Sequence, residues 1–340
     1  MRERRHEEDK VTQAVATAFA GLDRLVLAVS GGVDSMVMLH AAASIAPDRR
    51  PALLVASFDH GTGAVARRAV EAVRRTSKEL GLAFRGGKTD RAVVTEHQWR
   101  LARWTFLRGA AEEFGAPVAT GHTLDDQVET IFIRILRDAG PRGLAALFAE
   151  SEVIRPFLHL RRADLARFAR ARQVVHVEDP SNSTRSHLRN RVRHDLLPAI
   201  ARIRPGFPAQ LLSIAKRSAD WRSRMADIAD QLDAETGEDG SLRIARGALR
   251  GYDAESLRAL WPSLAARANV VMDRRGTHRL AEFTTKGVTG GSIQLSGGVE
   301  VLMLRDHMLL RRWDWRRVEA ARASRLGAPA PRTASHAGRM

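Results

Sequence analysis

Residues 26–36, which read VLAVSGGVDSM, constrain the fold more than any other part of the chain. β-forming residues come first, a Ser-Gly-Gly turn follows, and an apolar-rich segment reaching Ile45 predicts a helix. Glycines permit a turn in which successive backbone N–H groups face one point, and the helix N-terminus adds partial positive charge there. This stretch therefore predicts a phosphate-binding loop made of Ser30, Gly31, Gly32, Val33, Asp34 and Ser35.

The side chains of this loop suggest how a nucleotide is held. The hydroxyls of Ser30 and Ser35 can donate to phosphate oxygens, whereas Asp34 can face a phosphate only across a cation such as Mg²⁺. The loop lacks the lysine and the longer spacing of the common nucleotide P-loop. The alternative is an ordinary strand–turn–helix corner capped by Ser30. A bare Gly-Gly pair would favour that alternative, but the full pattern directly after a strand favours phosphate.

Length, composition and cysteine content set outer limits. A chain of 340 residues, 44% of them hydrophobic, can bury sizeable cores and is expected to form two domains. No apolar run approaches the ~18 residues of a membrane span, and the first residues lack the apolar stretch of a signal peptide, so we expect a cytoplasmic protein without membrane association. The absence of cysteine excludes disulfides, Cys-ligated zinc and thiolate mechanisms.

The net charge is +16, from 55 Lys and Arg against 39 Asp and Glu. Residues 181–225 hold ten basic and two acidic side chains, which is half of the excess. An arginine-rich composition can reflect genomic base content, and a charge run is often only a solvated face, but this density favours contact with a nucleic-acid backbone. Arg189, Arg191 and Arg193 alternate there before a predicted helix through Leu196 and Leu197.

Strands and helices alternate in the first part of the chain. Strands are predicted at 25–29, 53–58, 82–84 and 117–120, and helices at 11–19, 64–80 and 96–114. This order implies a parallel sheet with helices on both faces, in which ligands bind beyond the carboxyl ends of the strands. The polar or small residues at such ends are Ser30, Asp59, His60 and Gly121.

A second informative stretch is 121–130, GHTLDDQVET. Thr123, with Asp126 three residues later, is typical of a helix N-cap, and an apolar stripe follows at 128, 131, 132, 135 and 136. Acidic residues near a helix N-terminus can simply compensate its charge, which accounts for one or two acids. Three acids together with His122 favour a site that holds Mg²⁺ or receives a substrate ammonium, and these acids are Asp125, Asp126 and Glu129.

These motifs together resemble the tRNA(Ile)-lysidine synthase family of the N-type ATP pyrophosphatases. The resemblance rests on SGGVDS at 30–35, GHTLDDQVET at 121–130, EDPSN at 178–182, RNRVR at 189–193 and LLP at 196–198, which occur in the family's order. It implies an α/β fold, a parallel-sheet ATP pyrophosphatase domain with helices on both faces at 1–205. It also implies tRNA contact by Arg189, Asn190, Arg191 and Arg193, and a tRNA-binding helical linker and small α+β C-terminal domain at 206–318. Residues 319–340 are rich in Ala, Arg and Pro, and this composition predicts a disordered tail.

The sequence beyond residue 205 fits this organisation. It predicts a long amphipathic helix at 209–233, a polar turn at 236–241, a strand at 242–244, helices at 254–268 and 277–285, and a β-hairpin at 292–310.

The resemblance also implies a reaction. ATP would adenylate O2 of the wobble cytidine of a CAU-anticodon tRNA(Ile), and the ε-amine of free L-lysine would then join C2, giving lysidine, AMP and pyrophosphate. Codon reading would change from AUG to AUA. ATP and Mg²⁺ are the implied cofactors, and no obligatory protein partner is expected, although a homodimer is compatible.

By the same resemblance each motif residue has a role. Residues 30–35, with His60, Gly121 and His122, would hold ATP, and Asp34 and Asp126 would bind Mg²⁺. Asp126 and Glu129 would handle the lysine ammonium and its deprotonation. Arg103 would offset negative charge at the adenylate. The alternative for Arg103 is a solvated helix arginine beside a core Trp104. Asp34, Arg103, Asp126 and Glu129 are thus the predicted catalytic residues.

Rival functions and departures from the family pattern remain. A tRNA thiolase would need a cysteine, whereas another cysteine-independent amide synthetase acting on an adenylated small molecule stays open. A purely RNA-binding module would not need Asp34, Asp126 and Glu129 together. The family usually has Leu-Arg where Thr62-Gly63 stand, and Arg-Gly near Asp138-Ala139.

Overall fold

The computed structural model describes residues 2–61, 63–89, 96–149, 151–178, 184–185 and 187–313. The predicted tail at 319–340, Thr62 and the DPSN part of the third motif at 179–182 lie outside these residues. Two compact units divide the chain, Met1–Asp220 and Trp221–Met340. The division expected from the sequence, after residue 205, lies just before helix α10 (Phe207–Gln231), whereas the division between the compact units lies within this helix.

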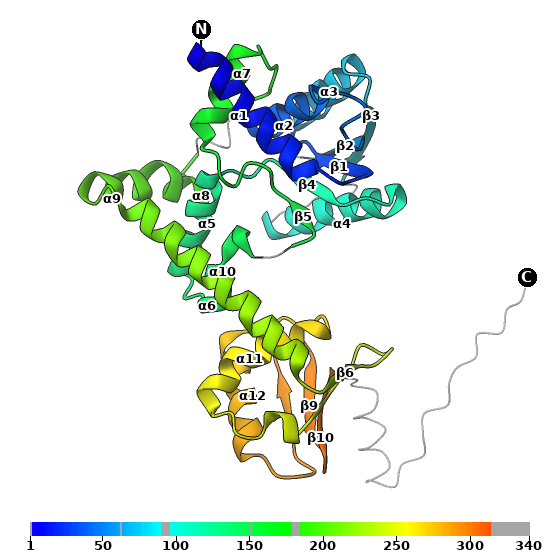
Figure 1. Ribbon diagram of the computed structural model, residues 1–340, viewed down its shortest axis with the longest axis vertical. Coiled ribbons are helices and arrows are strands. Elements are labelled where there is room, and N and C mark those ends of the chain that lie inside the picture. Colours follow the sequence, from blue (N-terminus) through cyan, green and yellow to red (C-terminus); the bar gives the residue numbers. More distant parts are fainter. Residues whose placement is uncertain are drawn as a thin grey trace, which may run out of the picture. The chain divides into compact units, whose positions relative to one another are not determined.

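A parallel five-stranded sheet forms the first unit, as the alternating pattern predicts (Figure 1). The order is β3-β2-β1-β4-β5, and every neighbouring pair is parallel. The short edge strand β5 has no counterpart among the strands predicted from sequence, because two residues are too few to give a period-2 pattern. The strands are β1 (Arg24–Ala28), β2 (Ala52–Asp59), β3 (Ala83–Lys88), β4 (Val118–Thr120) and β5 (Val153–Ile154).

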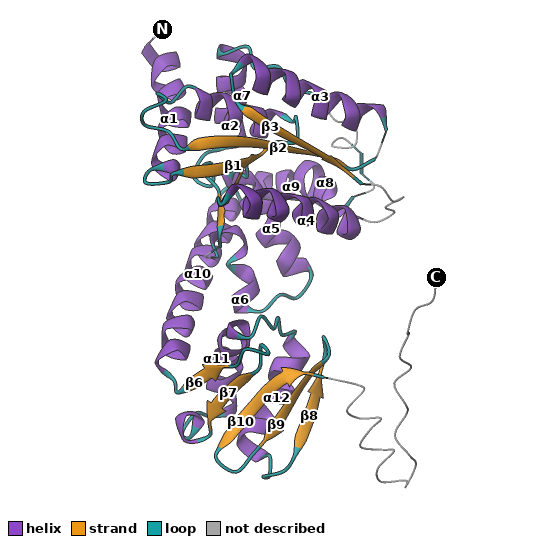
Figure 2. Ribbon diagram, turned by 90° about the vertical axis from the view of Figure 1, so that its right-hand side faces the viewer, coloured by secondary structure: helices purple, strands orange, loops and turns teal. Residues whose placement is uncertain are grey.

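Helices cover both faces of this sheet because β1 is apolar on both sides. Leu25 and Leu27 belong to the core on one face, and Val26 belongs to the core on the other. Figure 2 shows α2 and α3 on one side of the strands and α4 on the opposite side. The helices of these layers are α1 (Arg2–Phe19), α2 (Val33–Ala43), α3 (Ala64–Glu79), α4 (Glu96–Phe114) and α7 (Arg162–Ala171).

A third core joins α5 (Leu124–Leu136) to the helical segments that follow residue 187. Val128, Ile131 and Phe132 are buried there as the apolar stripe predicts, but the last two positions of the stripe, Ile135 and Leu136, are 41% and 52% exposed. The partners of α5 are α8 (Leu188–Arg191), the π-helical turn Val192–Leu196, α9 (Leu197–Ile203) and the first part of α10; the short helix α6 (Pro141–Leu144) and the 3₁₀ turn Ala146–Phe148 connect α5 to β5.

The arginines predicted to precede a helix lie inside it. Because 188–203 is one helical run, Arg189 and Arg193 are four residues apart on one face, and Arg191 points elsewhere. The expectation that these arginines precede the helix is therefore wrong.

The strand order fixes where a ligand can bind. β1 lies between β2 and β4, so the direction of the chain's progress across the sheet reverses beside β1. In such sheets the crevice lies beyond the carboxyl ends at this reversal. Ser30, His60 and Gly121 follow directly on β1, β2 and β4 and lie there as the sequence predicts.

The second unit is an antiparallel sheet of order β6-β7-β10-β9-β8 with two helices, which matches the small α+β domain that was expected. The predicted hairpin at 292–310 is three strands joined by two turns, and β6 was not predicted. The fully buried Trp261 anchors its core and donates from Nε1 to Thr284 Oγ1 at 2.9 Å. The elements are β6 (Ala234–Thr236), β7 (Leu242–Ala245), α11 (Ala254–Arg267), α12 (Arg274–Lys286), β8 (Ser292–Leu295), β9 (Val299–Met303) and β10 (His307–Arg312).

Within the described part of the chain, no helix combines the length and the apolar character needed to cross a bilayer.

The central strand gives a stability prediction. Leu27 is fully buried, so Leu27→Ala removes apolar contacts and leaves a cavity, and we expect a loss of about 2–5 kcal/mol in the free energy of unfolding measured by urea denaturation. Leu101→Ala in α4 is the matched control, because Leu101 is 58% exposed and should change stability by less than about 0.5 kcal/mol. Equal losses in the two variants would contradict this account of the core.

Candidate active site

The phosphate loop has the geometry of an anion cradle rather than a capped corner. Gly31 has φ +87°, and α2 begins after Gly32, whose position as N-cap carries no side-chain hydrogen bond. Ser35 Oγ donates to Gly32 O at 2.9 Å and accepts from Ser30 N at 3.1 Å. The alternative in which Ser30 caps the helix is therefore wrong. The N-terminal N–H groups of α2 have no side-chain acceptor and can face an anion.

Two glycines permit close backbone approach around this loop. A Cβ on Gly31 would lie 2.9 Å from Ala69 Cβ of α3, and its positive φ disfavours any side chain. A Cβ on Gly121 would lie 3.0 Å from Asp34 O. The end of β4 and the start of α3 therefore both pack directly on the loop, which explains why glycine is needed at these two positions.

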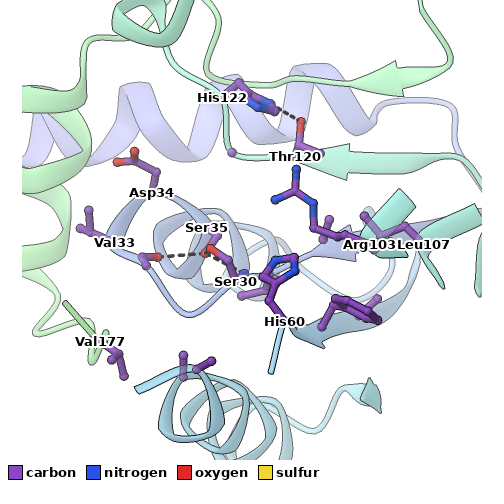
Figure 3. A pocket seen from close by; sticks show the side chains of 18 of the residues that line it. Ser30, Val33, Asp34, Ser35, His60, Arg103, Leu107, Thr120, His122 and Val177 are labelled. Atoms are coloured by element: carbon purple, nitrogen blue, oxygen red, sulfur yellow. Dashed lines mark hydrogen bonds between the residues drawn. The ribbon is translucent and has the colours of Figure 1, made fainter. Parts of the chain in front are cut away.

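A cavity of about 470 Å³ joins the two sequence motifs. The loop residues Ser30, Asp34 and Ser35 line it together with His122 and Asp126 from the second motif. In Figure 3 the Ser30–Ser35 contact lies between Asp34 on one side and His60 and Arg103 on the other. The predicted phosphate site and the predicted acid site thus share one cavity.

Among the basic side chains that line the cavity are two histidines whose pKa is lowered, and one arginine whose Nε has no hydrogen-bond partner among the described residues. Burial, and then the positive charge of Arg103, lower the pKa of His60. Burial lowers the pKa of His122 to about 4, and its Nδ1 lies 2.8 Å from Thr120 Oγ1, so its imidazole is neutral near pH 7. Arg103 is a cavity residue whose Nε has no hydrogen-bond partner among the described residues, so it is not a solvated surface arginine.

The N-terminus of α5 is built as predicted. Thr123 is the N-cap, and Asp126 completes a capping box by accepting from Thr123 N at 2.9 Å through Oδ2. Burial by itself would raise the pKa of Asp126, but Arg162 and the hydrogen bonds from Thr123 outweigh it and hold that pKa below its ordinary value. Asp126 is consequently an ionised carboxylate with one oxygen committed to the helix cap.

Asp126 and Glu129 form an acid pair that three arginines neutralise. Glu129 is 2% exposed and accepts from Arg193 through both oxygens, at 2.7 Å from Nε and 2.9 Å from Nη2. Asp126 Oδ1 accepts from Arg162 Nη2 at 2.9 Å, and Arg189 Nη1 lies 3.5 Å from Glu129 Oε2. The acids therefore do not project as a free cluster, and among described residues no three His, Asp or Glu side chains gather as metal ligands.

Asp34 is an acid that is only partly compensated. Burial raises its pKa to about 6, the first opposing influence being Arg162, whose Nε lies 3.6 Å from Oδ2. Its Oδ1 is buried without a hydrogen-bond partner among the described residues. A divalent cation between this carboxylate and a phosphate fits that orphaned oxygen, because Mg²⁺ sites commonly combine one or two carboxylates with substrate phosphates.

Comparison with known proteins agrees with this geometry. The PP-loop domain family matches residues 4–200. The tRNA(Ile)-lysidine synthase of Bradyrhizobium sp. is 34% identical over 280 residues, which cover 78% of this chain and 78% of that protein. The chain belongs to the tRNA(Ile)-lysidine synthase family. It is accordingly an enzyme of the ligase class.

Other similar proteins extend the comparison. The tRNA(Ile)-lysidine synthase of Parasynechococcus marenigrum is 29% identical over 302 residues, covering 84% of this chain and 88% of that protein. A solved structure of a U34-tRNA thiolase from Methanococcus maripaludis has a TM-score of 0.52 over 64% of this chain and 79% of its own. At 14% identity, that likeness concerns the fold alone.

In this member of the lysidine synthase family, the side chains of the basic segment 189–193 lie in three different environments. Arg189 and Arg193 contact the acid pair, Arg191 is exposed, and Asn190 is buried and donates from Nδ2 to Thr184 O at 2.9 Å. Sequence analysis missed Arg162 because it assigned no element between 141 and 178. A signal existed there, since Asp164 follows Arg161 by three residues and apolar positions at 165, 168 and 169 have helical spacing.

The loop geometry predicts a specific loss of ATP binding. Gly31→Ala places a Cβ against α3 at a positive φ, so we expect ATP affinity to fall at least about tenfold, equivalent to about 1.4 kcal/mol, in calorimetric titration. Gly21→Ala is the control, because Gly21 also has positive φ, +76°, but has open space around its Cβ position. If both variants bound ATP like the parent, the cradle would not be the nucleotide site.

Proposed function

We propose that this enzyme joins the ε-amine of L-lysine to C2 of the wobble cytidine of CAU-anticodon tRNA(Ile), after ATP has adenylated the cytidine O2. The observation that carries the proposal is the single cavity lined by both the phosphate loop and Asp126. Similarity to proteins named tRNA(Ile)-lysidine synthase supports the choice of tRNA and lysine. Decoding of AUA in place of AUG is the expected result of the product.

In the first step the cytidine O2 attacks the α-phosphorus of ATP, and the bond to the bridging oxygen of pyrophosphate breaks. Backbone N–H groups of residues 30–35 stabilise the charge that grows on pyrophosphate. The uncompensated guanidinium of Arg103 supports a role beside the adenylate, where it offsets negative charge. Its burial strengthens such an interaction by excluding water.

Asp34 is the residue we assign to Mg²⁺, which supplies charge neutralisation and orientation for the phosphates when bound. The orphaned Oδ1 supports this assignment. Asp126, the other predicted ligand, already accepts hydrogen bonds through both oxygens, so the proposal rests on Asp34.

In the second step the lysine amine attacks C2, and the C2–O bond to AMP breaks. We assign recognition of the lysine ammonium, and acceptance of the proton it loses, to Asp126 and Glu129. Asp126 lines the cavity, Glu129 is buried next to it, and this pair of carboxylates supports a cationic substrate there. We assign tRNA backbone contact to Arg189, Asn190, Arg191 and Arg193, of which Arg191 is the exposed member.

The decisive measurement is [¹⁴C]lysine incorporation into total tRNA. We expect incorporation with the parent enzyme and a loss of about 100-fold or more with Asp126→Asn, because the neutral amide cannot pair with an ammonium. The control is Asp48→Asn, an exposed position after α2, which should retain parent activity. Circular dichroism checks that Asp126→Asn keeps the fold.

Pyrophosphate release, measured with and without tRNA alongside lysine incorporation, tests the alternative function. An amide synthetase acting on a small molecule would release pyrophosphate without tRNA and incorporate no lysine into RNA, and that result would replace the present proposal.

Asp34 gives a prediction that separates function from stability. Asp34→Asn removes a buried charge that has no full partner, so the free energy of unfolding in magnesium-free buffer should equal or exceed that of the parent. The magnesium dependence of ATP binding, followed by calorimetry, should be lost. A variant that unfolds more easily, or that keeps this magnesium dependence, would refute the assigned role.

A further inference from the structure

Arg162 lies where the two halves of the cavity meet. Its Nε is 3.6 Å from Asp34 Oδ2, its Nη2 is 2.9 Å from Asp126 Oδ1, and its Nη1 is 3.3 Å from Glu129 Oε1. The side chain is 27% exposed and lines the cavity, whereas Glu129 is buried beneath it. One guanidinium therefore spans the acid of the phosphate loop and both acids proposed to receive lysine.

Hydrogen bonds hold the backbone of Arg162 against the start of α5. Arg162 N donates to Asp125 Oδ2 at 2.7 Å, and Leu124 N donates to Leu160 O at 2.9 Å. These two bonds tie the start of α7 to the start of α5. Any change in the contacts of Arg162 must therefore come from side-chain rotation, which a long flexible stem allows.

Two arginines that contact the acid pair also line the cavity, Arg162 and Arg193. Arg162 is the more easily displaced of the two. Arg193 holds Glu129 through two short bonds at 2.7 and 2.9 Å. Arg162 has one short bond, at 2.9 Å to Asp126 Oδ1, whereas its contacts with Glu129 are longer, at 3.3 Å, and its contact with Asp34 is 3.6 Å. An ammonium that binds Asp126 needs the oxygen now facing Arg162, because the other oxygen caps α5.

A bound nucleotide offers Arg162 a different partner. The phosphate loop begins across the same cavity, and Asp34, which Arg162 already approaches, lies within it. A guanidinium pairs with phosphate oxygens through two parallel hydrogen bonds, a geometry that a looser contact with three carboxylates does not provide. The negative charge of phosphates bound at the loop therefore draws the guanidinium of Arg162 away from Asp126 and Glu129.

We propose that Arg162 is a positioning residue that couples nucleotide binding to lysine binding. Without nucleotide it occupies Asp126 Oδ1, and with nucleotide it turns to the phosphates and opens that oxygen to the ε-ammonium, while Glu129 keeps its bonds to Arg193. This inference rests on the proposed function for the identity of the amine. It makes the coupling reciprocal, so lysine also favours nucleotide binding.

The test measures lysine affinity by calorimetry in magnesium-containing buffer, with and without α,β-methylene-ATP, which cannot release pyrophosphate. In the parent enzyme the analogue should tighten lysine binding at least about tenfold. In Arg162→Gln the ratio should fall to within about twofold, through tighter binding in the absence of the analogue, because Asp126 Oδ1 then lacks its shortest arginine contact.

Two further variants complete the experiment. Arg170→Gln, an exposed position on the same helix, should keep the parent ratio. Arg162→Lys keeps the charge but lacks the planar fork, so its ratio should lie between those of the parent and Arg162→Gln. This variant decides the question if circular dichroism finds Arg162→Gln unfolded.

Three outcomes would overturn the inference. The first is a parent-like ratio in a folded Arg162→Gln, or in Arg162→Lys where Arg162→Gln is unfolded. The second is weaker lysine binding by Arg162→Gln without the analogue, which is what a merely structural arginine would give. The third is no lysine binding by the parent enzyme with or without the analogue. Lysine incorporation into tRNA by the parent enzyme distinguishes failure of this coupling from failure of the proposed function. Incorporation would persist in the first two outcomes. It would be absent if the proposed function itself were wrong.

Discussion

Burial of two carboxylates on α5 is the constraint on which the rest of the site depends. Asp126 and Glu129 are 8% and 2% exposed, and a charge removed from water to that extent is stable only with close counter-charges and hydrogen bonds. Arg162 on α7 and Arg189 and Arg193 in the helical run after residue 187 supply them. The packing of three separate helical segments against each other is thus enforced by charge as well as by the apolar core around Ile131.

The same arrangement gives the cavity two electrostatic halves. On one side are backbone N–H groups, Arg103 and neutral histidines, which suit phosphate. On the other side are carboxylates whose oxygens already accept hydrogen bonds from arginines. Asp34 stands between the halves with a raised pKa of about 6, caused first by burial. The proposed adenylation and amine attack need both kinds of environment in one cavity, which lies where the strand order reverses beside β1.

Local chemistry was predictable from the sequence and long-range pairing was not. The turn at Gly31, the cap at Thr123 and the strand ends that carry His60 and Gly121 follow from residue types at short spacing, and the structure has them where they were expected. The bonds between Arg193 and Glu129 join positions 64 apart, and those between Arg162 and Glu129 join positions 33 apart. No spacing rule gives such pairs. Arg189 and Arg193 were consequently assigned to RNA contact with no indication that they also contact Glu129.

The π-helical turn at Val192–Leu196 has a consequence for how this helical run tolerates change in length. A π-turn holds one residue more than an α-helical turn would, so residues before and after it are out of register by about 100° relative to a continuous α-helix. Arg193 faces Glu129 within the turn, while Leu197 and Ile200 beyond it pack toward α5. Deleting a single residue there would restore regular winding and swing either the guanidinium or the apolar face away from α5, so the irregularity is what lets one helix serve charge and core at once.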